Sequence, residues 1–208
     1  MGRILGTRVP PLFPEAGPIC AMLYGEAPGP RGADQSGIPF WGDRAGKLVY
    51  RTLERIGAVK VPAKAWDFWD GACLRKLGLV PTIQEVVLGN AYPNCPTDDG
   101  EHFRAPTNRE LSSSTNLRRL QAELHQAASQ CSNRLYVIAL GKRATWLFQQ
   151  LQDKPLFDFH VLPHPSAQGL LQAAPNKGRD MKLADLEQTW EQHLLDILVS
   201  AHCKPKRA

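Results

Sequence analysis

Four short segments, far apart along the chain, place polar side chains beside residues that make rigid turns. The first reads Gly25-Glu26-Ala27-Pro28-Gly29 and follows an apolar run. Its two glycines and its proline favour a tight turn, which would present the carboxylate of Glu26 at the end of that run. A carboxylate held in this way could position a water molecule. Taken alone, the pentapeptide is better explained as a simple turn with an exposed glutamate.

The second segment, residues 37–46, reads GIPFWGDRAG. Phe40 and Trp41 lie between glycines, where either ring could form a platform for stacking a nucleobase, a contact worth about 1–3 kcal/mol per base. Each ring could equally fill the core beneath the loop. Asp43 could simply cap the helix that follows. The segment therefore indicates either a stacking site or an inward-packed turn.

The third segment begins at Asn90, directly after another apolar run, and continues AYPNCP. A carboxamide offers both a donor and an acceptor, so it can match the O4 and N3–H of uracil and mismatch cytosine. A well-made pair of such hydrogen bonds discriminates by about 1–3 kcal/mol. An isolated asparagine more commonly satisfies loop backbone groups, which is the competing explanation.

The fourth segment reads His164-Pro165-Ser166-Ala167. A histidine beside a rigid proline turn can donate a hydrogen bond to an oxygen that becomes negative as a glycosidic bond breaks. Removal of such a donor from other oxyanion sites typically costs about 3–4 kcal/mol. A histidine at a turn or helix start is the alternative, and the six histidines of the chain show that the residue type alone proves little.

The periodicity of apolar residues predicts the elements that must position these segments. Short apolar runs predict four strands, at residues 19–24, 85–89, 135–140 and 160–163. Helical spacing predicts four main helices, at residues 43–56, 109–131, 142–151 and 180–199. Their alternation predicts an α/β fold, a three-layer α/β/α sandwich with a central, mostly parallel four-stranded sheet. The functional crevice should lie beyond the carboxyl ends of the strands, in the loops at 25–42, 90–108, 141–143 and 164–179.

Length and composition set further bounds. The 208 residues, 43% of them hydrophobic, predict a single domain over 1–208, with an irregular N-terminal segment at 1–17 and a basic tail at 200–208. No apolar run approaches the roughly 20 residues that span a bilayer, and prolines interrupt the opening segment, so we expect a cytoplasmic protein without membrane contact. We expect it to be a monomer.

The formal net charge of +5 is compatible with a polyanionic partner such as nucleic acid. Part of this excess, contributed by Lys204, Lys206 and Arg207, could be no more than a solvated chain end. The five cysteines are odd in number and include no CxxC pair, so free thiols are expected rather than a disulfide framework or a metal site. The cysteines are Cys20, Cys73, Cys95, Cys131 and Cys203.

Taken together, the four segments resemble the uracil-DNA glycosylase superfamily, and most closely its iron–sulfur branch, usually called family 4. The matching stretches are GEAPG at 25–29, GIPFWGDRAG at 37–46, GNAYPNCP at 89–96, ALGKRA at 139–144 and HPSA at 164–167. The resemblance covers about residues 19–199. It implies a monofunctional hydrolase that flips uracil, or another deaminated base, out of DNA, cleaves its N-glycosidic bond and so initiates base excision repair.

The resemblance also implies a role for each segment. Glu26 and His164 would be the catalytic residues, the first holding the attacking water and the second stabilising the departing base. Phe40 would stack on the flipped base, and Asn90 would read its edge. The implied base-binding residues are Gly25, Ala27, Phe40 and Asn90.

Two further stretches would contact the DNA itself. The turn formed by Pro165, Ser166 and Ala167 would press into the duplex near the vacated stack. Lys142 and Arg143 would suit a phosphate, although solvated charge at a helix start explains them equally well.

The sequence departs from the family 4 pattern in its cysteines, because only Cys20 precedes the first motif and only Cys95 lies near a matching place. We therefore expect no iron–sulfur cluster, no metal and no other cofactor. Residues 30–34 (PRGAD) replace the acidic stretch of the family, so the substrate preference could differ. Ala27 lies where a different branch of the superfamily has its catalytic acid.

Two other functions stay open. The altered stretch at 30–34 would suit a damaged-DNA or abasic-site binding protein with weak or lost glycosylase activity. A nucleotide-binding α/β protein that acts on free metabolites is disfavoured, because no GxGxxG or GxxxxGK[ST] phosphate-binding motif occurs.

Overall fold

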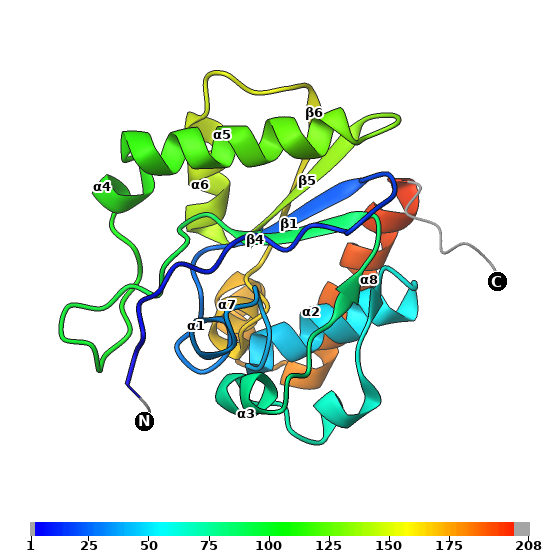
Figure 1. Cartoon of the computed structure of the whole chain (residues 1–208). Helices are drawn as coiled ribbons and strands as arrows, with labels where there is room; N and C mark the ends of the chain where they lie inside the picture. The colour runs from blue at the N-terminus through cyan, green and yellow to red at the C-terminus, as the bar shows by residue number, and fades with distance from the viewer. Residues whose placement is uncertain (1–2, 202–208) are drawn as a thin grey trace.

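A four-stranded parallel sheet forms the centre of the molecule (Figure 1). The computed structural model describes residues 3–201. The strand order is β4-β1-β5-β6. The strands are β1 (Ala21–Gly25), β4 (Val86–Asn90), β5 (Leu135–Leu140) and β6 (Phe157–Leu162). The predicted α/β fold is confirmed, and β6 begins three residues before the predicted 160–163.

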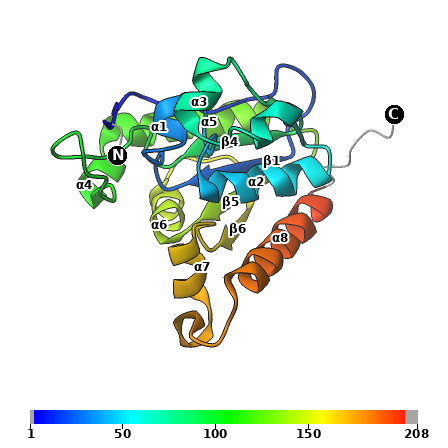
Figure 2. The same ribbon diagram turned by 90° about the horizontal axis from the view of Figure 1, so that it is seen from below.

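Helices cover both faces of this sheet, as Figure 1 shows. Side chains alternate along β1, so that Leu23 joins one hydrophobic cluster and Tyr24 joins the other. The first cluster is closed by α2 (Arg44–Arg55) and α8 (Leu183–Ser200), which lie side by side (Figure 2). The second is closed by α5 (Ser114–Ser129) and α6 (Lys142–Gln150). The three-layer arrangement therefore follows from strands that are apolar on both faces.

The predicted helix at 109–131 is instead two helices, α4 (Asn108–Leu111) and α5. Thr107 and Glu110 form a capping box at the start of α4. Ser113 accepts a hydrogen bond from the backbone N–H of Asn116 and so starts α5. The second cap, Ser113, lies inside the apolar pattern at 109–131, which explains why periodicity alone merged the helices.

Several short elements lie between the predicted ones. β2 and β3 pair as a separate antiparallel sheet. Of the helices, α7 follows the HPSA segment directly. The short elements are α1 (Ala33–Ser36), β2 (Val59–Lys60), η1 (Ala63–Trp66), α3 (Gly71–Lys76), β3 (Thr82–Ile83), α7 (Ala167–Ala173) and η2 (Pro175–Gly178).

Other expectations concern the chain ends and the cysteines. Residues 3–17 contain no helix or extended strand, and Leu12 pairs with Leu88 across a single bridge. From residue 202 onward, the predicted basic tail and Cys203 lie outside the described residues. Cys73, Cys95 and Cys131 are free thiols as expected, whereas Cys20 is disulfide-bonded, which corrects the expectation for that residue. Within residues 3–201, no helix is both long and apolar enough to cross a membrane.

Candidate active site

A cavity of about 600 Å³ lies at the carboxyl edge of the sheet. Three of the strands end directly beside it: Glu26 follows β1, Asn90 ends β4 and His164 follows β6. After β5, helix α6 contributes Arg143. Phe40 lines the same cavity. The four side chains singled out in the sequence, Glu26, Phe40, Asn90 and His164, are thus brought together by parallel strands whose ends meet at one edge.

Glu26 is partly buried and carries an ion pair. Its Oε1 lies 3.1 Å from Nε of Arg143, and the Glu26 side chain is 25% exposed. Burial raises the pKa of Glu26, and the neighbouring Arg143 guanidinium opposes that rise. The carboxylate therefore has a strong cationic neighbour in a partly desolvated setting.

Phe40 is held in an unusual backbone conformation. Its φ is +61°, a left-handed value that costs about 1–3 kcal/mol in a residue other than glycine. Two glycines make room for it: a Cβ on Gly46 would lie 1.5 Å from the Phe40 carbonyl oxygen, and one on Gly25 would lie 2.8 Å from Cε1 of the ring. The ring is therefore fixed at the cavity wall, beside the end of β1.

The neighbouring Trp41 belongs to the core. It is fully buried, and its Nε1 donates to the carbonyl oxygen of Leu79 at 3.0 Å. Its ring meets those of Tyr50 and Trp69 edge to face. The core explanation therefore holds for Trp41, whereas Phe40, which is 6% exposed and belongs to the same hydrophobic cluster, also lines the cavity.

Asn90 combines burial with an unpaired donor. It is 4% exposed, and its Nδ2 has no hydrogen-bond partner within the described residues. A Cβ on Gly25, its register partner in β1, would lie 3.2 Å from Oδ1 of Asn90. The explanation that Asn90 satisfies loop backbone through this amide N–H group is therefore wrong, and a residue that lines the cavity keeps a buried donor without a partner.

A buried network fixes the backbone at Asn90. Nη2 of Arg119 donates to the carbonyl oxygens of Asn90 (3.1 Å) and Ala91 (2.8 Å). Nη1 of Arg119 lies 2.6 Å from Oε2 of Glu123, which also accepts from the Tyr24 hydroxyl. Sequence reasoning missed this support, because its members lie on α5 and β1, far from Asn90 along the chain.

His164 has a defined hydrogen-bonding state. Burial lowers the pKa of its imidazole, which favours the neutral ring at neutral pH. The backbone N–H of Ser166 donates to Nδ1 at 3.2 Å. Since a neutral ring whose Nδ1 accepts must carry its proton on Nε2, the free donor of His164 is Nε2–H.

The predicted DNA-contacting residues divide between two surfaces. Arg143 and Ser166 line the cavity, and Ser166 also caps α7 by accepting from the Gly169 N–H. Lys142 lines a separate hollow beside α6. Pro165 and Ala167 flank Ser166 and do not line the cavity. Arg143 is already engaged by Glu26 and by the carbonyl oxygen of Pro106.

Other residues of the cavity were not singled out from the sequence. Phe103, which is 48% exposed, and Ala105 line it from the loop between β4 and α4. The available signal was an aromatic ring within an otherwise polar stretch. Asp43 also lines the cavity, and its side chain accepts from the Gly46 N–H at 2.7 Å, so the expected helix cap is confirmed.

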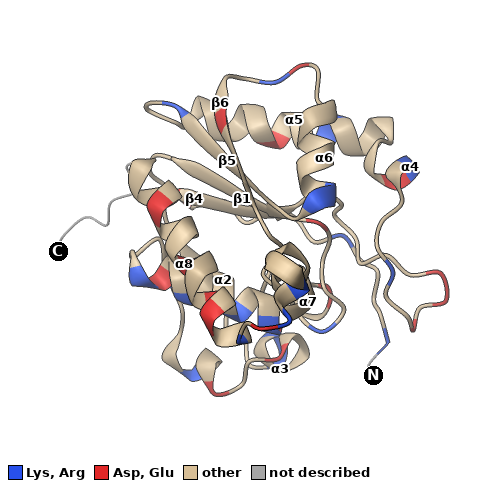
Figure 3. Ribbon diagram, turned by 180° about the vertical axis from the view of Figure 1, so that it is seen from behind, with Lys and Arg blue, Asp and Glu red and all other residues tan. Residues whose placement is uncertain are grey.

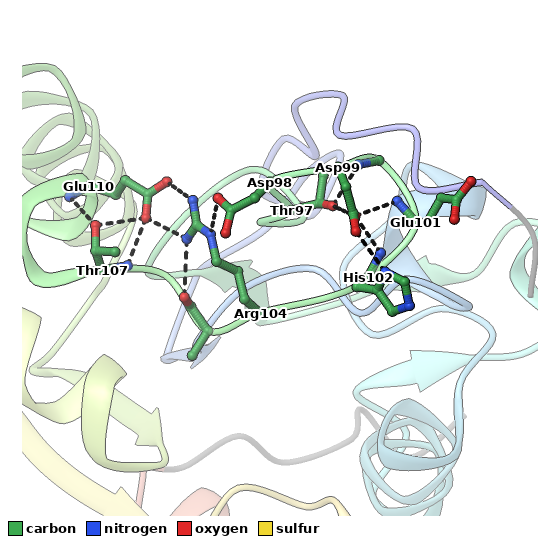
Figure 4. Close-up of polar contacts among 10 residues, drawn as sticks. Thr97, Asp98, Asp99, Glu101, His102, Arg104, Thr107 and Glu110 are labelled. Carbon is green, nitrogen blue, oxygen red and sulfur yellow. Dashed lines mark hydrogen bonds and ion pairs between the residues drawn. The ribbon is translucent and has the colours of Figure 1, made fainter.

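The loop that carries Phe103 is locked by its own side chains (Figure 4). Asp99 accepts from the backbone N–H groups of Glu101 and His102. The Arg104 guanidinium donates to both carboxylate oxygens of Glu110, at 2.7 and 2.8 Å, and to Asp98 at 2.7 Å. Residues 97–107 therefore form a preorganised wall, despite the lack of a helix or extended strand.

The sequence also predicted that the protein holds no iron–sulfur cluster and no metal ion. Among residues 3–201, no three His, Cys, Asp or Glu side chains gather in an arrangement that could hold a metal ion. The absence of an iron–sulfur cluster stays a prediction.

Comparison with known proteins shows the family to which this fold belongs. The model of the uracil DNA glycosylase superfamily matches residues 17–202, and the chain belongs to that superfamily. A type-5 uracil-DNA glycosylase of Mycobacterium leprae (strain TN) is 33% identical over 70 residues. That match covers 34% of this chain and 30% of the relative, so the chain spans under a third of the length of that protein. The family 4 assignment stays a prediction.

Proposed function

We propose that the protein is a monofunctional DNA glycosylase that excises uracil from DNA by hydrolysing the N-glycosidic bond and so initiates base excision repair. The observation that carries this proposal is that Asn90, whose buried Nδ2 has no partner, lines one cavity together with Phe40, Glu26 and His164. A buried amide donor without a partner costs about 1–3 kcal/mol, so a ligand acceptor that meets it gains affinity. The working form is proposed to be a monomer, because all these side chains belong to one chain.

Recognition of the base would combine stacking with edge reading. The ring of Phe40 would stack on the extrahelical base, and Gly25 and Ala27 would leave room for it. Nδ2 of Asn90 would donate to O4 of uracil, and Oδ1 would accept from N3–H. Cytosine presents an amino donor in place of O4, so the same amide would disfavour it.

Bond cleavage would require stabilisation of two charges of opposite sign, one on the sugar and one on the base. As the glycosidic bond lengthens, the sugar becomes oxocarbenium-like and the base becomes anionic. Nε2–H of His164 would donate to the base oxygen, and the carboxylate of Glu26 would orient a water molecule and offset the positive charge on the sugar. A neutral His164 suits this role, because it donates without giving its proton away.

Engagement of the duplex would precede this chemistry. Extrusion of the base costs a few kcal/mol, less for a mispaired uracil, so selectivity would begin at this step. The turn of Pro165, Ser166 and Ala167 would press against the vacated stack. Lys142, on the outer side of α6, would meet a phosphate. Arg143 would bind a phosphate only after giving up its contacts with Glu26 and the carbonyl oxygen of Pro106.

A base-release panel tests the proposal. The purified protein is incubated with single- and double-stranded oligonucleotides containing uracil, hypoxanthine, xanthine or alkylated bases, and released bases are quantified. Release of free uracil is expected, strongly slowed in Glu26→Gln and His164→Ala at near-unchanged DNA affinity. Unchanged turnover in the His164 variant would remove its assigned role.

The alternative of a damaged-DNA binding protein with weak or lost activity is favoured by one observation, the ion pair that engages Glu26. A carboxylate held by an arginine is less available to a developing positive charge. Tight binding of uracil-containing DNA with retention of the intact base in the same panel would select this function.

A further inference from the structure

Arg143 joins the candidate carboxylate to the locked loop between β4 and α4. It is the second residue of α6, which starts where Gly141 turns the chain with a φ of +92°. Its Nε lies 3.1 Å from Oε1 of Glu26, and its Nη1 donates to the carbonyl oxygen of Pro106. One guanidinium therefore connects the end of β1 with the loop between β4 and α4.

The far end of this connection is rigid. Pro106 lies between Arg104 and Thr107, and both of these residues hydrogen-bond to Glu110 (Figure 4). A carbonyl oxygen fixed in this way limits the positions open to the guanidinium. Arg143 is consequently oriented from the loop side and presents its Nε to Glu26.

We propose that Arg143 is a positioning residue for the reaction, which keeps the Glu26 carboxylate charged and directed within the cavity. This inference rests on the proposed function and deepens it. It also replaces the role of phosphate ligand that the sequence suggested for Arg143, since the guanidinium, although its side chain is 40% exposed, is already engaged by Glu26 and the carbonyl oxygen of Pro106.

The other ionisable groups around the cavity have partners of their own or are neutral, which leaves Arg143 as the main charged neighbour of Glu26. These other groups are Asp43 and Arg44, at the start of α2, and His164. Asp43 is tied to the Gly46 N–H, and Arg44 pairs with Glu187 of α8. Without Arg143, the burial that raises the pKa of Glu26 would act without the opposing charge of the guanidinium.

The first test needs no catalysis. The titration of the Glu26 carboxyl is followed by carbon NMR in the free protein, for the wild type, Arg143→Gln and Arg134→Gln. Arg134 is the matched control, because its Nε pairs with Asp158 at 3.0 Å and neither residue lines the cavity. We expect the midpoint of Glu26 to move to higher pH in Arg143→Gln and to stay in place in Arg134→Gln. An unmoved midpoint in Arg143→Gln would overturn the proposal.

The second test follows the pH profile of single-turnover uracil release. Loss of Arg143 should move the acid limb to higher pH, with a rate on that limb about tenfold lower for each pH unit moved. Arg143→Lys, which keeps the charge, should restore much of the wild-type profile. An equal fall at every pH would indicate a merely structural role and would contradict the proposal.

The two tests separate the inference from the function on which it rests. If the wild type releases no base, the proposed glycosylase activity fails, whereas the NMR midpoint still reports whether Arg143 governs the ionisation of Glu26. If uracil is released but neither the midpoint nor the acid limb moves, the positioning role fails alone.

Discussion

At the scale of single residues, close contacts around Gly25 determine how the side chains of the candidate site are spaced. A Cβ on Gly25 would lie 2.8 Å from Cε1 of Phe40 and 3.2 Å from Oδ1 of Asn90. Real Cβ atoms essentially never approach closer than 3.0 Å, so a larger residue at this position must displace the ring. Gly25 therefore sets the distance between the Phe40 ring and the Asn90 amide.

Gly25→Ala tests this spacing. Because the added methyl group displaces Phe40 from beside Asn90, we expect uracil release to slow by roughly 10–100-fold, measured in single turnover. The double variant Gly25→Ala/Phe40→Leu should recover melting temperature, since the smaller side chain removes the clash, without recovering uracil release. Full activity in Gly25→Ala would show that the ring does not contact the base.

Residue chemistry was more predictable from the sequence than residue environment. The carboxylate of Glu26, the amide of Asn90 and the imidazole of His164 suggest their roles through the chemistry of the side chains themselves. The unpaired state of Asn90 Nδ2 and the pairing of Glu26 with Arg143 depend on segments far apart along the chain, and no local pattern encodes such contacts.

At the scale of elements, the strands were predictable because they are short continuous apolar runs, and most of the long helices because their apolar residues recur at helical spacing. The division between α4 and α5 was not, because it is decided by side-chain caps at Thr107 and Ser113. The wall formed by residues 97–107 was also missed, since charged and capping side chains rather than apolar periodicity organise it.

Glu110 gives this wall a pH dependence. Hydrogen bonds from the Arg104 guanidinium, assisted by Thr107, lower the pKa of Glu110 to about 2. A depressed pKa in the folded state contributes stability above the ordinary glutamate pKa, about 4.3, that is lost as pH falls towards 2. We expect amides of residues 97–107 to lose hydrogen-exchange protection across this window.

The matched variant is Glu110→Gln. It removes one titrating group, so protection of the loop should be weaker at pH 5 and should depend less on pH below it than in the wild type. Equal pH dependence in the wild type and Glu110→Gln would assign the effect to another group, such as Asp99, whose pKa is also lowered by hydrogen bonds from His102 and Glu101.

At the scale of the whole molecule, a buried network of polar contacts joins helix α5 to the sheet and to the candidate site. Arg119 and Glu123 lie on α5 against the sheet and are almost fully buried, at 10% and 8% side-chain exposure. Their contacts reach the last residue of β4 and the central strand β1. In the part of the chain that the structure describes, basic and acidic residues are interspersed along the elements in this view (Figure 3).

Arg119→Leu should destabilise the protein by about 3–5 kcal/mol, because it leaves the buried Glu123 charge without its partner. Urea denaturation measures this loss. Arg119→Leu/Glu123→Leu should recover a large part of the free energy of unfolding, since no uncompensated charge remains. A loss below about 1 kcal/mol in the single variant would show that the pair is effectively solvated.

The central claim is that one cavity reads and excises an extrahelical uracil through Asn90. The most direct measurement is the ratio of single-turnover rates on oligonucleotides that contain uracil or cytosine opposite guanine, for the wild type and Asn90→Asp. The wild type should release uracil and strongly disfavour cytosine. In Asn90→Asp the ratio should fall by roughly 5–150-fold, because a carboxylate cannot donate to O4 of uracil. An unchanged ratio, or no uracil release by the wild type, would contradict the claim.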